Sequence, residues 1–148
     1  MTLSPTLHAS AVLVGARAVL IRGPAGAGKS RLAYALIQAS WTGLVAFARL
    51  VGDDRVHLEA AHGRLLVRPA QALAGLIEIR GLGIRCVPFE PVAAVGLVVD
   101  LAAAGAERLP VSAESVIDGI ALPRLAVAPG EDPLAMLIAA LRSPDSGR

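Results

Sequence analysis

Eight residues near the start of the chain have the types and the spacing that bind a polyphosphate. They match the pattern GxxxxGK[ST], and they stand between a run typical of a strand and a pattern typical of a helix, which is the context that this motif requires. Glycines let backbone N–H groups turn towards phosphate oxygens, the helix N-terminus adds positive charge, lysine neutralises phosphate charge and a serine hydroxyl can ligate Mg²⁺. The predicted phosphate-binding loop consists of Gly23, Pro24, Ala25, Gly26, Ala27, Gly28, Lys29 and Ser30.

Lys29 is the only lysine of the chain, and the other thirteen of its fourteen basic residues are arginine. A compact ammonium group retained at this one position indicates a role that the larger, planar guanidinium group cannot fill.

Two adjacent aspartates lie further along the sequence than the loop. Asp53 and Asp54 end an apolar run, where a phosphate-binding protein needs a carboxylate that faces the metal and the attacking group. Because adjacent residues of a strand point to opposite faces, we expect one of the two carboxylates to face the phosphate. A solvated turn is the alternative interpretation of this pair.

A third candidate region alternates charged and apolar residues. Glu78 and Arg80 are two residues apart, so both charges share one face of a strand while the intervening isoleucines face the core. A solvated strand face is the alternative. The adjacent Gly81 and Gly83 favour a close approach of the backbone to a ligand.

Hydrophobic periodicity predicts the elements that position these residues. Most of the apolar runs are typical of strands, and two segments have helical spacing. We therefore expect an α/β fold with a mixed sheet and flanking helices. The expected elements are two strands over 11–22 that turn at Gly15, a helix over 29–40, strands over 44–51, 95–101 and 120–127, with an edge or bend at Pro123, a hairpin over 56–59 and 64–68, a short helix over 70–76 and a final helix from Pro133, capped by Asp132, to Leu141.

Composition restricts the class of protein. The 148 residues are 55% hydrophobic and 3% aromatic, which argues against disorder and against base stacking along single-stranded nucleic acid. A net charge of +2 does not favour a polyanion partner. The single Cys86 allows neither an intrachain disulfide nor a thiolate zinc cluster. With no apolar run of membrane-spanning length, we expect one domain over 1–148, cytoplasmic, with no nucleic-acid or membrane partner.

Together these motifs resemble the C-terminal catalytic domain of the bacterial HPr kinase/phosphorylase family. GPAGAGKS is similar to the family's GxSGxGKS, VGDDRV to its ADDxV, and IEIRGLGI to its signature LEIRGLGI. His8 is similar to a histidine of the strand ahead of the P-loop, residues 107–109 to a DRL element, and the resemblance continues to about Leu141. It implies a P-loop-containing kinase domain that uses ATP and Mg²⁺ to phosphorylate a serine of the phosphocarrier HPr, and it suggests a homo-oligomer.

The resemblance also implies roles for individual residues. The P-loop with Lys29 would hold the nucleotide phosphates, and Ser30 and Glu78 would ligate Mg²⁺. Asp53 and Asp54 would supply the general base, without a choice between them. His8 and Arg108 would complete the site around the transferred phosphate.

The chain departs from the family pattern at three places. By this resemblance we expect a short form without the family's usual N-terminal domain, and Arg31 stands where the family commonly has glutamate. Glu131 and Asp132 stand where a basic residue and asparagine are expected, in a loop tied to the reverse reaction. We therefore expect weak phosphate-dependent removal of the phosphoserine, unless Asp132 only caps the final helix and Arg108 or Arg124 binds phosphate. A non-catalytic nucleotide sensor and a small-molecule kinase are the alternative functions.

Overall fold

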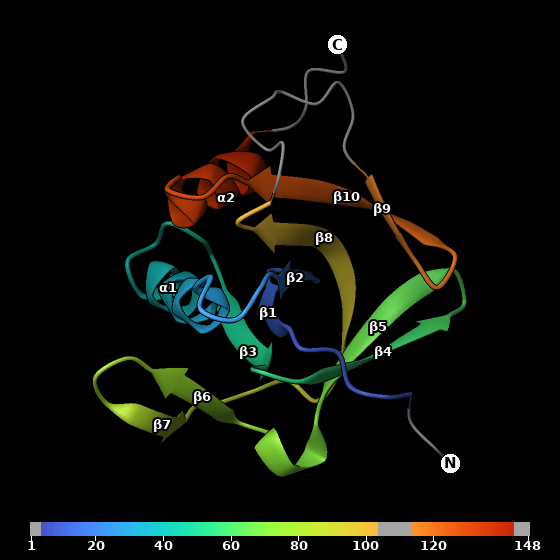
Figure 1. Cartoon of the computed structure of the whole chain (residues 1–148), viewed down its shortest axis with the longest axis horizontal. Helices are drawn as coiled ribbons and strands as arrows, with labels where there is room; N and C mark the ends of the chain where they lie inside the picture. The colour runs from blue at the N-terminus through green and yellow to red at the C-terminus, as the bar shows by residue number, and fades with distance from the viewer. Residues whose placement is uncertain (1–3, 104–113, 144–148) are drawn as a thin grey trace.

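The structure, a computed structural model, describes residues 4–103 and 114–143 (Figure 1). Its elements follow the predicted order of strands with one long helix after the P-loop and one at the end. In chain order they are β1 (Ser10–Val14), β2 (Arg17–Arg22), α1 (Lys29–Trp41), β3 (Ala48–Gly52), β4 (Val56–Ala61), β5 (Arg64–Pro69), the 3-10 turn η1 (Gln71–Leu73), β6 (Leu76–Ile79), β7 (Gly83–Cys86), β8 (Ala93–Leu101), β9 (Glu114–Ile117), β10 (Ile120–Val127) and α2 (Pro133–Arg142).

Within these residues, eight of the strands form one mixed sheet, as predicted. Its central path runs β3-β1-β2-β8-β10-β9, and the hairpin β4–β5 joins it through β5 and the start of β8. Strands β2, β8 and β10 are parallel, whereas β1 is antiparallel to both of its neighbours. The P-loop therefore leaves the carboxyl end of a strand that lies inside the sheet, which fixes where the loop begins.

The two faces of the sheet are covered differently. Because side chains alternate along β2, Val19 and Ile21 pack towards helices α1 and α2, while Ala18 and Leu20 pack towards the hairpin β4–β5. Figure 1 shows the helices on one side and the hairpin on the other. Leu36 of α1 is fully buried in the helical layer. Such burial holds the start of α1, and with it the P-loop, against the sheet.

Several predicted elements are confirmed. The strands around Gly15, the helix after the P-loop and the hairpin around residues 62 and 63 are present. Asp132 caps α2, since its carboxylate accepts hydrogen bonds from the N–H groups of Leu134 and Ala135. At Pro123, where an edge or a bend was expected, β10 changes its partner: it pairs with β9 up to this residue and with β8 from Arg124 onwards.

Three elements differ most from the prediction. Strand β3 begins at Ala48, not at residue 44, because the N–H groups of Leu44 and Val45 are bonded to Ala39 O at the end of α1. The expected helix over 70–76 is a single 3-10 turn, since the chain reaches a left-handed Gly75 two residues later. Strand β9 was not predicted.

Candidate active site

The predicted phosphate-binding loop joins β2 directly to α1. Gly28 precedes the first helical residue with φ 100°, and Gly26 has φ 81°; a Cβ built at either residue would meet no atom within 4 Å. These glycines are thus needed for their left-handed backbone and not for lack of space. The N–H groups of the first turn of α1 have no partner within the helix. The loop accordingly has the conformation and the donors of an oxyanion cradle.

Lys29 lies at the base of this loop and is only 7% exposed. Its ammonium group donates hydrogen bonds to Gly23 O at 2.8 Å and to Pro24 O at 3.1 Å. An ammonium group has three N–H bonds, so one donor remains for a further acceptor. Lys29 also lines the pocket described below, which places its positive charge where phosphate oxygens would lie.

Asp53 is a buried carboxylate that joins several elements of the site. It follows β3, is 4% exposed and accepts hydrogen bonds from protein donors through both oxygens. Ser30 Oγ lies 2.8 Å from Oδ1 and 2.9 Å from Oδ2, Ser10 Oγ lies 2.6 Å from Oδ1, and the N–H of Glu78 lies 3.2 Å from Oδ2. Asp53 therefore ties β1 and β6 to the serine at the start of α1.

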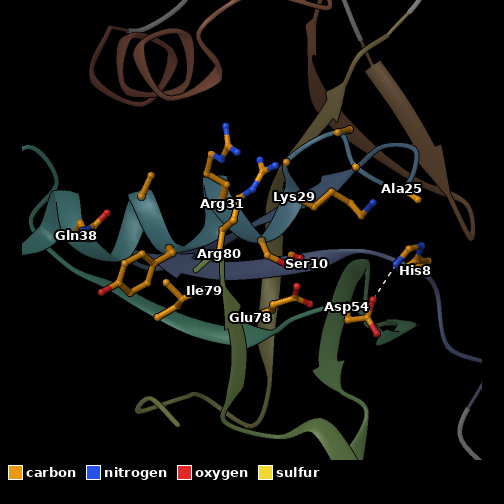
Figure 2. A pocket seen from close by; sticks show the side chains of 16 residues that line it. His8, Ser10, Ala25, Lys29, Arg31, Gln38, Asp54, Glu78, Ile79 and Arg80 are labelled. Carbon is orange, nitrogen blue, oxygen red and sulfur yellow. Dashed lines mark hydrogen bonds and ion pairs between the residues drawn. The ribbon is translucent and has the colours of Figure 1, made fainter. Parts of the chain in front are cut away.

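Asp54 lies in a different environment from Asp53. It has φ 70°, is exposed, and its Oδ1 lies 2.8 Å from His8 Nε2. Asp54 lines the pocket described below and Asp53 does not, which agrees with the expectation that one of the two carboxylates faces the site. The strand ends at Gly52, and the left-handed backbone at Asp54 separates the two side chains. Asp53 thus contacts Ser30, and Asp54 points into the pocket beside His8 (Figure 2).

His8, Lys29, Ser30 and Asp54 line one pocket of about 730 Å³. Figure 2 shows it between α1, the end of β6 and the chain before β1. Three permanent cations line it, Lys29, Arg31 and Arg80, and two carboxylates, Asp54 and Glu78. The pocket continues along α1, past the P-loop. The remaining lining residues are His8, Ser10, Ala25, Gly26, Ala27, Gly28, Ser30, Tyr34, Ala35, Gln38 and Ile79.

The motif around Glu78 forms the hairpin β6–β7. Ile77 is buried and Glu78 is exposed to the pocket, as the alternation predicts. Gly81 has φ 88° and Gly83 has φ 91°, and a Cβ at either would meet no atom within 4 Å. Their left-handed backbone forms the tight turn that returns β7 alongside β6. A close approach of this backbone to a ligand stays a prediction.

Some candidates lie elsewhere. Arg108 lies outside the described residues. Glu131 and Asp132 do not line the pocket, and Asp132 is engaged as the cap of α2. The structure therefore gives no support to the expectation that these two acids repel an incoming phosphate.

Arg124 is bound to Asp100, together with Arg22, on the three parallel strands. Arg22 Nε donates to Asp100 Oδ1 at 2.7 Å, and Arg124 Nε donates to Oδ2. Burial raises the pKa of the Asp100 carboxyl, but the hydrogen bonds and charges of both arginines outweigh it, so the net pKa is lowered. Since Arg22 directly precedes the P-loop, this cluster fixes the end of β2 from which the loop departs.

Sequence reasoning missed Ser10, Tyr34 and Gln38 as pocket residues. Ser10 is the first residue of β1, one residue before the predicted start of that strand, and His8 lies outside the strand. Tyr34 and Gln38 lie one helical turn apart on the side of α1 that borders the pocket. Their pocket position follows from the packing of β6 against α1, which no local pattern reveals.

The residues present fit ATP and Mg²⁺. The loop offers backbone donors and one ammonium group for phosphates, and Ser30 and Glu78 offer oxygen ligands of the type that Mg²⁺ prefers. Within residues 4–103 and 114–143, no three His, Cys, Asp or Glu side chains form a metal-binding group. A magnesium ion shared with phosphates needs only one or two protein ligands. In the same described part of the chain, no helix is long and apolar enough to cross a membrane.

Comparisons with known proteins agree with this geometry. The HPr kinase/phosphorylase of Clostridium beijerinckii is 38% identical over 78 residues, which cover 53% of this chain and 24% of that protein. The enzyme of the same name from Streptococcus thermophilus is 40% identical over 80 residues, with 53% and 24% covered. The solved structure of the HPr(Ser) kinase/phosphatase from Coxiella burnetii superposes with a TM-score of 0.75 at 26% identity, covering 94% of this chain and 95% of that chain.

The family relationship rests on more than half of the chain. The sequence model described as HPr Serine kinase C-terminal domain matches residues 1–89, which include the P-loop, both aspartates and the β6–β7 hairpin. The chain spans about a quarter of the length of the curated relatives that it matches. Its α/β architecture is that of the superposed P-loop kinase structure. This chain therefore belongs to the family of HPr serine kinase C-terminal domains.

Proposed function

We propose that the protein is an ATP-dependent serine kinase that phosphorylates the phosphocarrier HPr. The observation that carries this proposal is the joining, in one pocket, of the P-loop cradle with the exposed His8–Asp54 pair. The first can hold a polyphosphate, and the second can accept a proton from a hydroxyl group. The names of the relatives, HPr kinase/phosphorylase and HPr(Ser) kinase/phosphatase, support HPr as the acceptor.

The donor side of the pocket consists of residues 23–30. The loop N–H groups and the Lys29 ammonium bind the phosphates of ATP, and Ser30 Oγ and Glu78 hold Mg²⁺. When bound, Mg²⁺ neutralises charge on the phosphates. Asp53 keeps Ser30 in place, since the Ser30 hydroxyl donates its hydrogen bond to this carboxylate, with Oγ 2.8 Å from Oδ1 and 2.9 Å from Oδ2, which leaves the lone pairs of Oγ for a metal ion.

On the side of the pocket that would receive the serine of HPr, we assign the general base to Asp54 and not to Asp53. Asp53 is buried with its oxygens already bonded to Ser10, Ser30 and the N–H of Glu78. Asp54 is exposed in the pocket, and His8 contacts only one of its oxygens. The serine oxygen of HPr forms a bond to the terminal phosphorus as the bond to ADP breaks, and Asp54 takes the serine proton.

The proposal also covers the domain organisation, the location and the assembly of the protein. Residues 1–148 act as a single catalytic domain in the cytoplasm, where ATP is available. Exposed apolar side chains such as Trp41 and Val116, each 67% exposed, support assembly into a homo-oligomer. Arg108 joins the site around the transferred phosphate, as the family pattern implies. Weak phosphate-dependent removal of the phosphoserine also remains part of the proposal, supported by the relatives' names.

Incubation with radiolabelled ATP separates this function from its alternatives. The reaction contains Mg²⁺ and either HPr, HPr whose acceptor serine is alanine, or a pool of small hydroxylated metabolites. We expect label on HPr and none on the alanine variant. Label in the metabolite fraction alone would indicate a small-molecule kinase. ATP binding without transfer to any acceptor would indicate a nucleotide sensor.

A further inference from the structure

Ser10 faces Asp53 because of an irregularity in the pairing of β1 with β3. Val12 pairs with Leu50, but the preceding Ala11 pairs with Gly52, so Val51 is an extra residue on β3. Such a bulge shifts the register by one residue and changes the direction of the side chains beyond it. Here it brings the residue before Ala11 against the residue after Gly52. The pair Ser10–Asp53 thus results from a specific backbone feature next to the pocket.

The bond between these residues is short and buried. Ser10 is fully buried, Asp53 is 4% exposed, and Ser10 Oγ lies 2.6 Å from Oδ1. An ionised carboxylate only accepts hydrogen bonds, so the hydroxyl groups of both Ser10 and Ser30 donate to Asp53. Hydrogen bonds to a charged group are stronger than neutral ones, and burial strengthens them further. Ser10 is therefore a strong restraint on the orientation of the Asp53 carboxylate.

We infer that Ser10 is a positioning residue for the metal site, acting through Asp53 on Ser30. With Ser10 bonded to Oδ1, the carboxylate cannot rotate away from the position in which both oxygens face Ser30 Oγ. The Ser30 proton then points to Asp53, and the lone pairs of its oxygen point to the pocket. The same carboxylate holds the N–H of Glu78, so the restraint reaches both residues that the proposed function assigns to Mg²⁺.

The inference rests on the proposed function for the identity of the metal, and its test measures metal binding without transfer to HPr. Binding of Mn²⁺, as a substitute for Mg²⁺, to the ADP-loaded chain is followed by electron paramagnetic resonance. ADP affinity is measured separately in the presence of a chelator. The variants are Ser10→Ala and Ser10→Cys; cysteine retains the volume but is a weak donor. The matched control is Ser40→Ala, whose hydroxyl bonds Ile37 O at 2.6 Å inside α1.

We expect both Ser10 variants to raise the Mn²⁺ dissociation constant about tenfold, as expected for one lost hydrogen bond to a charged group. ADP affinity without metal should stay within about twofold, because Ser10 contacts neither Lys29 nor the loop glycines. The control should change neither quantity. Unchanged Mn²⁺ binding in the Ser10 variants would overturn the inference, and so would a parallel loss of metal-free ADP binding, which would indicate general loosening. A wild-type chain that binds Mn²⁺ with ADP but does not phosphorylate HPr contradicts the proposed function alone.

Discussion

Replacement of Lys29 by alanine is expected to abolish most of the transfer while leaving the fold intact. At an effective dielectric constant of about 20, two unit charges about 4 Å apart interact by about 4 kcal/mol. Part of this energy acts equally on bound ATP and part only on the transition state. We therefore expect kcat for HPr phosphorylation to fall by about 10²–10³, with an additional weakening of ATP binding.

We expect Lys29→Ala to have only a small effect on the stability of the fold. The ammonium group bonds two loop carbonyls, those of Gly23 and Pro24, and Pro24 is exposed, so water can replace the lost donor there. We expect a loss of about 1 kcal/mol in the free energy of unfolding, or a few degrees in Tm. Phosphorylation of HPr is measured at saturating ATP beside thermal unfolding, with Arg55→Ala as a control that removes a positive charge outside the pocket lining. Transfer by Lys29→Ala within tenfold of the wild-type rate would refute the assignment.

Three further predictions follow from the pocket and the sheet beneath it. Glu78→Gln keeps the shape but removes the charge, so the Mg²⁺ concentration for half-maximal rate should rise about tenfold with little change in Tm; an unchanged metal requirement would make Glu78 structural. Asp54→Asn removes the proposed base and should lower kcat by about 10²–10⁴ while ATP binding is retained, as measured by calorimetry; near-normal kcat would exclude Asp54. Asp100→Asn leaves Arg22 and Arg124 without their carboxylate and should cost about 1–3 kcal/mol at neutral pH. Because the folded pKa of Asp100 is lowered, this stability is present above the unfolded pKa of about 3.9 and is lost as pH falls through the folded value, so the Tm difference between variant and wild type should narrow in acid.

Much of the fold follows from local sequence signals. Apolar runs predict β1, β2 and β8, and the Asp132-Pro133 pair predicts the start of α2. Strand β9 was missed because its residues are at most partly buried. Its pairing with β10 stabilises it, and no local sequence pattern reveals that pairing. To predict the hairpin β6–β7, Gly81 and Gly83 would have to be interpreted as turn residues. Their left-handed φ values show that they have this role.

In the site, too, some features follow from local sequence signals and others only from contacts in space. The P-loop was predictable because one contiguous segment contains the whole cradle. The alternation of a strand predicted that one of Asp53 and Asp54 faces the site, but it did not predict which one, because that depends on where β3 ends and on the left-handed conformation of Asp54. Ser10 was missed because the bulge that turns it towards Asp53 exists only once β1 and β3 pair. Spatial contacts of this kind carry no local signature.

Transfer of the terminal phosphate of ATP to HPr is the reaction that most directly tests the proposed kinase. The full chain is mixed with HPr, Mg²⁺ and ATP labelled either in the γ-phosphate or in the α-phosphate, and protein-bound label is mapped to a residue. We expect label on a serine of HPr from γ-labelled ATP only, and its loss with Lys29→Ala. Absence of label on HPr, when ATP binds and HPr is folded, would show that the chain is not an HPr kinase.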